Sequence, residues 1–182
     1  MSKAHFITPT GATPDVMTVR LGTAIAVGGV IGTGGSYLPG IDDGKIVQFV
    51  GESQYALAPQ GALIEGIITG VEQALSGGWS IGGIVCNEEI FVTADGLQAT
   101  PGVGAIAIGS FVVAGTLTPA GTALTAYPKV AQATMQLGEV AASLTEAGYQ
   151  AKYSAYAWQV VSLGTAGTGA VGTTIVISRI GS

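Results

Sequence analysis

The stretch that most constrains the fold is residues 101–127, which contain no charged side chain. Within residues 111–117 (FVVAGTL), both alternating sets of side chains are apolar or small, as expected for a strand that is covered on both faces. Residues 118–121 (TPAG) then predict a turn, because Pro fixes φ and Gly tolerates positive φ. We therefore predict a pair of apolar strands joined by small turns, with no acid, base or metal ligand among them.

Glycine and proline divide the rest of the chain into similar short segments. The sequence has 30 Gly and seven Pro, which is typical of a β protein with many turns. Besides the uncharged stretch, we predict strands at residues 17–21, 45–50, 55–58, 62–72, 79–86, 88–93, 155–163 and 173–180. Turns are predicted at residues 42–44, 59–61, 76–78 and 94–96, and a loop at 164–172. Gly66 and Gly70 are expected to mark bulges or close contacts.

Eight to ten short strands of this kind predict a mainly β fold, a sandwich or barrel. At most one short helix is expected, near residues 139–147, where Val140 and Leu144 have helical spacing and Gly148 suits a C-cap. Strand is an equal alternative for residues 132–140.

The beginning of the chain differs from the remainder. Residues 28–40 (GGVIGTGGSYLPG) cannot form a stable helix, and few large side chains precede Leu21. We predict an extended N-terminal arm, or a long Gly-rich loop, over residues 1–44 and one β domain over residues 45–182. An ordered arm of this length is expected to lie on a neighbouring subunit or on a larger surface.

Charge is scarce along the whole chain. Only 9% of residues are charged and 48% are hydrophobic, against a usual charged share of about 25%. Such a surface is either built of small residues or buried against partners. The six basic residues are scattered and the net charge is −5, so we expect no nucleic acid as partner.

Targeting and redox signals are also weak. One cysteine allows no intrachain disulfide, which suits synthesis in a reducing cytosol. Residues 21–31 are apolar but shorter than the ~20 residues of a membrane helix. They also begin too deep in the chain for a signal peptide, so we expect neither a signal peptide nor a membrane partner.

Two glycine patterns resemble nucleotide-binding motifs but lack their context. Residues 167–172 (GTGAVG) match G-x-G-x-x-G, yet a predicted strand follows where a helix is required, and the chain ends ten residues later. Gly44 and Lys45 lack the Ser or Thr that follows the lysine of a P-loop. We therefore expect no cofactor.

The chemically versatile residues are isolated or paired only with their chain neighbours. His5 lies in the predicted arm, and Cys86 is interpreted as a buried apolar thiol. The pairs Asp42–Asp43 and Glu88–Glu89 supply too few ligands for Ca²⁺, so we interpret them as a turn and a strand start kept in water. We therefore predict no catalytic residue, no metal site and no enzymatic activity.

Aromatic residues offer one binding hypothesis. A sugar-binding platform is conceivable, although a role in the core or an interface is favoured because aromatics are only 7% of residues. The candidates for the platform are Trp79, Trp158, Tyr149, Tyr153 and Tyr156. Among them, Trp158 is expected to anchor the core.

Two stretches together resemble a known family. Residues 58–96 and 111–130 consist of short apolar runs joined by Gly, Thr and Ala turns. In this style the chain resembles the head decoration, or cement, proteins of tailed bacteriophages, in which a Thr- and Pro-rich N-terminal arm is common. The resemblance implies a β-barrel, β-tulip-like or jelly-roll-like domain and contributes no catalytic residue.

The same resemblance implies a role. The expected function is that of a viral structural protein, made in the host cytoplasm, that binds the capsid surface of a virion and bridges neighbouring capsomers. The expected partners are the major capsid protein and two further copies in a homotrimer. Two alternatives remain open: an adhesin or carbohydrate-binding β-sandwich module, and another virion component such as a tail tube or fibre subunit.

Overall fold

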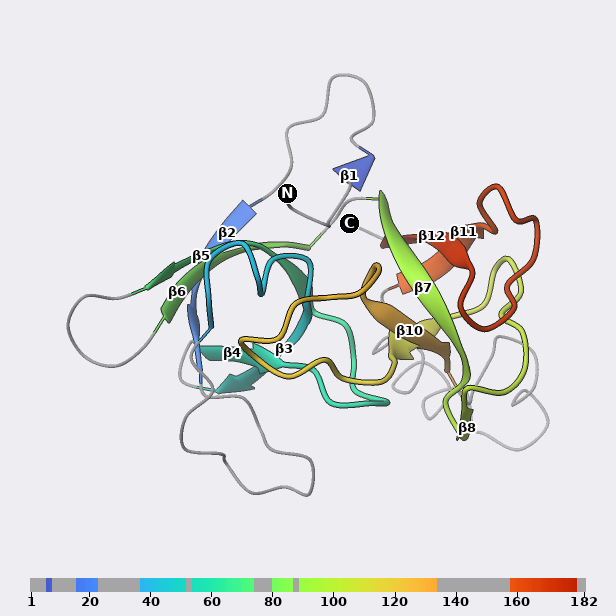
Figure 1. Cartoon of the computed structure of the whole chain (residues 1–182), viewed down its shortest axis with the longest axis horizontal. Coiled ribbons are helices and arrows are strands. Elements are labelled where there is room, and N and C mark those ends of the chain that lie inside the picture. Colours follow the sequence, from blue (N-terminus) through green and yellow to red (C-terminus); the bar gives the residue numbers. More distant parts are fainter. Residues whose placement is uncertain are drawn as a thin grey trace, which may run out of the picture.

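The computed structural model describes residues 6–7, 16–22, 37–51, 54–73, 80–86, 89–133 and 158–179. Every regular element among these residues is a strand, which confirms the mainly β prediction (Figure 1). The strands are β1 (Phe6–Ile7), β2 (Val16–Leu21), β3 (Ile46–Gly51), β4 (Gln54–Leu57), β5 (Gly66–Gln73), β6 (Ser80–Val85), β7 (Glu89–Leu97), β8 (Thr100–Pro101), β9 (Val112–Ala114), β10 (Lys129–Gln132), β11 (Trp158–Ser162) and β12 (Thr174–Arg179).

The first half of the chain forms a closed barrel in the order β2-β4-β3-β5-β6, drawn in blue to green in Figure 1. Strand β2 closes it, because β2 pairs in parallel with β4 and antiparallel with β6. The prediction of an arm is therefore wrong for these residues: Val19, Leu21 and Tyr37 are all buried in the barrel core. A domain that began at residue 45 would lack one strand of its barrel.

The second half forms a sheet in the order β11-β12-β7-β10-β9, with β7 at its centre. Strand β10 runs parallel to β7, whereas β12 runs antiparallel to it. The two ends of this sheet approach each other, because Phe111 bridges Gln159 and the Val160 N–H donates to the Ser110 carbonyl over 3.0 Å. The other edge of β9 is covered by residues 61–62, which exchange two backbone hydrogen bonds with Ala114. Neither terminal strand of this sheet therefore presents a long open edge.

The barrel and the sheet share a wall. Neighbouring residues of a strand point to opposite faces, so Val47 and Ile68 fill the barrel while Ile46 and Ile67 pack into the core of the sheet. All four side chains are buried for this reason. An apolar strand without alternation, which the sequence shows at several places, is thus explained by two cores on either side of one wall.

Trp158 joins the two halves, and its predicted role as a core anchor is confirmed. Its side chain is 1% exposed in the core of the sheet, and its indole N–H donates to the Ile64 carbonyl over 2.9 Å. Because a buried indole N–H needs an acceptor, this bond also orients the connection between β4 and β5.

Two local predictions are wrong. Residues 94–96 do not form a turn, since β7 continues to Leu97 and the turn to β8 follows at residues 98–99. Gly96 adopts a positive φ of 81° within the strand, so it bends the ladder without ending it. The predicted strand pair within residues 101–127 is also absent, because β9 pairs with β10 and residues 116–128 form an irregular connection.

Other predictions hold. Residues 120–121 form the expected turn, with Gly121 at a φ of 74°. Gly70 lies at a register shift between β5 and β6, and a Cβ on Gly66 would come within 2.9 Å of the Ile84 side chain. The predicted helix near residues 139–147 and the turn at residues 76–78 lie outside the described residues.

Candidate functional site

Two loops at the far end of the second sheet form one surface. Residues 102–109 follow β8, and residues 163–173 connect β11 to β12. They are bound together by an isolated bridge between Ala105 and Ala170 and by the Ile106 N–H, which donates to the Gly169 carbonyl over 2.9 Å. Figure 1 shows the two loops side by side, in yellow-green and red. We call residues 101–109 together with 165–172 the loop face.

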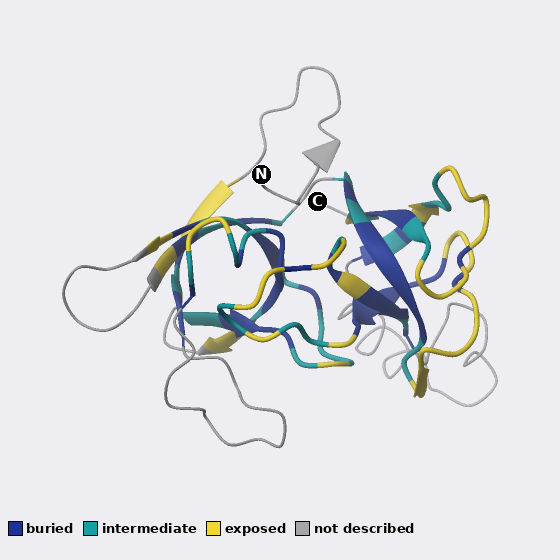
Figure 2. Cartoon of the chain, viewed as in Figure 1, coloured by how far each residue is buried: buried dark blue, intermediate teal, exposed yellow. Residues whose placement is uncertain are grey.

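The loop face exposes apolar side chains. Val103 and Ile108 are 61% and 62% exposed, and Val171 is 41% exposed. Most of the remaining positions of the loop face are also exposed, as the yellow ribbon in Figure 2 shows. No charged residue occurs between residues 96 and 128 or between residues 153 and 178. An exposed surface with apolar side chains and no charge is typical of a protein-binding site.

The loop face is held in place by hydrogen bonds to the backbone. The Leu97 N–H donates to the Val103 carbonyl over 2.9 Å, and the Gly102 N–H donates to the Asp95 carbonyl over 2.8 Å. The Thr173 hydroxyl lies 2.9 Å from the Thr168 carbonyl and 2.7 Å from the Ala170 carbonyl of its own loop, and its one proton can be donated to either of them. A surface that is ordered before binding loses less conformational entropy when a partner docks.

Glycine is required where the two loops touch. A Cβ on Gly169 would overlap the Ile106 carbonyl oxygen and lie 2.7 Å from the Ile106 carbonyl carbon. This glycine belongs to the G-x-G-x-x-G pattern of residues 167–172, which is followed by β12 instead of a helix. The pattern therefore serves close packing of two backbones, and the context of a dinucleotide site is missing.

A group of buried charged side chains lies where the barrel meets the sheet. Asp42 and Lys45 form a buried ion pair with a distance of 2.5 Å between Nζ and Oδ1, and their side chains are 0% and 3% exposed. The Lys45 ammonium also donates to the Pro119 carbonyl, and the Asp42 carboxylate accepts the Gly121 N–H over 3.0 Å. The interpretation of Asp42 as a solvated turn residue is therefore wrong, because this carboxylate attaches the connection after β9 to the barrel.

Asp95, on β7 of the sheet, also binds the connection after β9. Its Oδ2 atom accepts hydrogen bonds from the N–H and the hydroxyl of Thr116, over 2.7 and 2.6 Å. The ammonium of Lys129 lies 3.5 Å from Oδ1 and is partly exposed. Together, Asp42, Lys45 and Asp95 hold the irregular connection of residues 116–128 in place. We call these three residues the charged seam.

Burial and charge at the seam also affect nearby acids. Tyr37 is buried beside it, and desolvation, with a further contribution from the negative charge of Asp42, raises the pKa of Tyr37 to about 12. Its hydroxyl accepts the Leu57 N–H over 3.2 Å, which lowers the pKa by a smaller amount. Burial and the charge of Asp42 likewise raise the pKa of Asp43.

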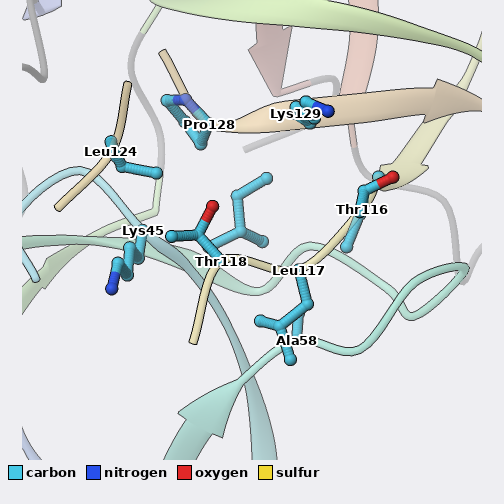
Figure 3. Close-up of a pocket in the computed structure, with 11 residues that line it drawn as sticks. Lys45, Ala58, Thr116, Leu117, Thr118, Leu124, Pro128 and Lys129 are labelled. Carbon is cyan, nitrogen blue, oxygen red and sulfur yellow. The ribbon is translucent and has the colours of Figure 1, made fainter. Parts of the chain in front are cut away.

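The pocket drawn in Figure 3 lies next to the seam. Leu117, Leu124 and Pro128 surround it, and its volume is about 20 Å³. That is room for about one water molecule, far below the ~300 Å³ at which pockets for small organic ligands begin. This pocket therefore does not supply a substrate site.

Only some of the residues considered from sequence lie in the described part of the chain. Trp158 is buried and cannot belong to an exposed aromatic platform, and Cys86 is partly exposed at the edge of the barrel core instead of fully buried. Glu89 is half-buried at the start of β7. The other candidates lie outside the described residues; they are His5, Trp79, Glu88, Tyr149, Tyr153 and Tyr156.

The described part of the chain has neither a cluster of metal-ligating side chains nor a membrane-spanning helix. Within it, no group of three or more His, Cys, Asp or Glu side chains is placed to hold a metal ion. None of its elements is a helix long and apolar enough to cross a membrane.

Comparisons with known proteins gave no match. No family model matches the sequence, and neither a curated protein nor a solved structure matches the chain.

Proposed function

We propose that this chain is a structural protein of a virion: a decoration protein that binds the outside of a bacteriophage capsid and bridges neighbouring capsomers. Its partners are the major capsid protein and further copies of itself, most simply as a homotrimer. It acts by adding contact area at many symmetric sites, so it needs no catalytic residue and no cofactor.

The observation that supports this proposal is the loop face. Val103 and Ile108 are more than half exposed on a backbone that is held by hydrogen bonds and by contacts at glycine. A binding protein gains from such a surface, because exposed apolar side chains on a rigid support lose little entropy on docking. The resemblance of residues 58–96 and 111–130 to decoration proteins agrees with this use.

A binding assay tests the proposal. The purified chain would be mixed with expanded, undecorated heads of the phage that carries this coding sequence, and the heads would be sedimented. We expect saturable binding in a fixed number of copies per head, and a higher temperature of head disruption. Absence of binding to the heads, or binding only to tails, would contradict the proposal. The second result would favour a tail or fibre subunit instead.

One observation favours a second candidate function, a carbohydrate-binding module. Phe49 is 50% exposed on β3, and its ring makes an edge contact with Tyr55 at a centroid distance of 5.5 Å. An exposed ring of this kind can stack on a sugar. The hypothesis predicts binding on a glycan array that Phe49→Ala abolishes and Ile108→Ala leaves unchanged.

A further inference from the structure

We infer that the loop face is where a second copy of this chain docks. The inference deepens the proposed function, on which its biological role rests, by naming the partner of this surface. The contact itself is a physical property of the purified protein and can be measured without a capsid.

Charge is the first reason for choosing a second copy as the partner. The chain has a net charge of −5, so like charge opposes the approach of two copies through surfaces that carry acidic residues. All eleven acidic residues lie outside residues 96–138 and 147–182, which include both segments of the loop face. The two segments of the loop face therefore bring no carboxylate of their own into the contact. Desolvation of charge is avoided for the same reason.

The sheet topology supplies the second reason. Exposed strand edges are the usual alternative for association between β proteins. The barrel is closed, and the outer strands β9 and β11 of the other sheet are covered by residues 61–62 and 109–111. Among the described elements, the long strands thus leave little edge for a second copy, whereas the loop face remains open.

The apolar side chains provide the contact. Val103, Ile108 and Val171 project from loops that are hydrogen-bonded to each other, and the small residues between them allow a close approach of backbones. In protein interfaces, a few buried apolar anchors contribute most of the binding free energy. A carboxylate at Ile108 would be desolvated in such a contact.

Native mass by light scattering, over a range of concentrations, tests the inference on the full chain. Wild type is compared with Ile108→Asp, with Val103→Asp as a second variant of the same face, and with Val16→Asp as the control. Val16 is 52% exposed on the barrel, so the control adds the same charge at an apolar position of similar exposure away from the loop face. Circular dichroism and thermal unfolding check that each variant is folded.

We expect wild type and Val16→Asp to form the same small oligomer. The two loop-face variants should dissociate, with a dissociation constant raised at least about 30-fold, the loss of one strong contact. A wild type that stays monomeric at 100 µM would overturn the inference, and so would folded loop-face variants with the same mass as wild type.

Head binding by the same variants separates the inference from the proposed function. If Ile108→Asp keeps the wild-type mass but no longer binds heads, the loop face contacts the capsid, and only the inference fails. If a loop-face oligomer forms but never binds heads, the proposed function fails and the inference stands.

Discussion

The charged seam and the loop face reverse the usual distribution of side chains. At the seam, Asp42, Lys45 and Asp95 are at most 3% exposed, although charged residues are rarely buried in proteins. On the loop face, Val103 and Ile108 are more than 60% exposed, although they are apolar. Both departures from the common pattern occur in or against the uncharged stretch of residues 101–127.

The difference shows that one stretch of uniform composition serves two purposes. Residues 111–115 are buried and fill the core, residues 116–128 are held by the seam, and residues 101–109 are mostly exposed. Buried charges that are paired and hydrogen-bonded fix a geometry, whereas exposed apolar residues on a fixed geometry can bind a partner. Four predictions, from the largest expected effect to the smallest, test this division of roles.

Removal of one partner of the buried ion pair should have the largest effect. Lys45→Met leaves the Asp42 carboxylate buried without its counter-ion, and the expected loss in the free energy of unfolding is about 3–5 kcal/mol. The double variant Asp42→Asn with Lys45→Met should recover most of this loss, because the Asn oxygen still accepts the Gly121 N–H. Urea unfolding measures both. A single variant as stable as wild type would show that the seam does not hold the connection.

Alkaline pH should lower the free energy of unfolding through Tyr37, which is buried beside the seam. The unfolded chain loses the Tyr37 proton near pH 10, whereas the folded state keeps it until its pKa of about 12. The folded state therefore binds more protons between these values, and its stability falls as pH rises from 10 to 12, by up to about 3 kcal/mol. Below pH 10 the Tyr37 hydroxyl is protonated in both states, so its titration does not change the stability with pH. Tyr37→Phe should flatten the fall in urea unfolding across this interval, and an unchanged slope would contradict the assignment.

Substitution of Gly169, where the two loops touch, should have the third largest effect. Gly169→Ala places a methyl group against the Ile106 carbonyl, and we expect a loss of about 2–3 kcal/mol with faster hydrogen exchange of the Ile106 amide. Gly167→Ala is the matched control: its Cβ meets open space, so only the positive φ of 62° costs about 1 kcal/mol. Equal losses would mean that the contact between the loops is not tight.

Charge on the loop face should have the smallest effect on stability. Ile108→Asp is expected to change the free energy of unfolding by less than about 0.5 kcal/mol, because the side chain is exposed in the monomer. The measurement is urea unfolding at a concentration where wild type is monomeric. A loss of several kcal/mol would place Ile108 in the core and remove it from the surface.

Much of the strand content was predictable, since it depends on local signals. The alternation and the Gly and Pro punctuation located β3, β4, β11 and β12 to within a few residues. The errors arose where the same residue type is compatible with two different structures. Gly96 looked like the end of a strand, but the ladder of β7 continues through it to Leu97. Asp42 looked like a solvated turn residue, but Lys45 and Gly121 provide its partners in the buried seam.

The candidate site was less predictable than the fold. Composition indicated that part of a weakly charged surface would be covered by partners, and no cluster of catalytic residues was expected. It did not reveal that residues 101–109 would lie against residues 165–172, because that contact joins loops about 60 residues apart in the chain. No sequence signal separated the exposed Val103 and Ile108 from the buried Val112 and Val113.

The sequence by itself therefore determined the class of fold, because glycine, proline and side-chain alternation act over a few residues. Only the tertiary structure decided that β2 closes the barrel, that a carboxylate and an ammonium are buried together, and that one uncharged run is core while its neighbour is surface. Each of these depends on partners distant in the chain. Burial is a property of that assembled environment and not of the local sequence.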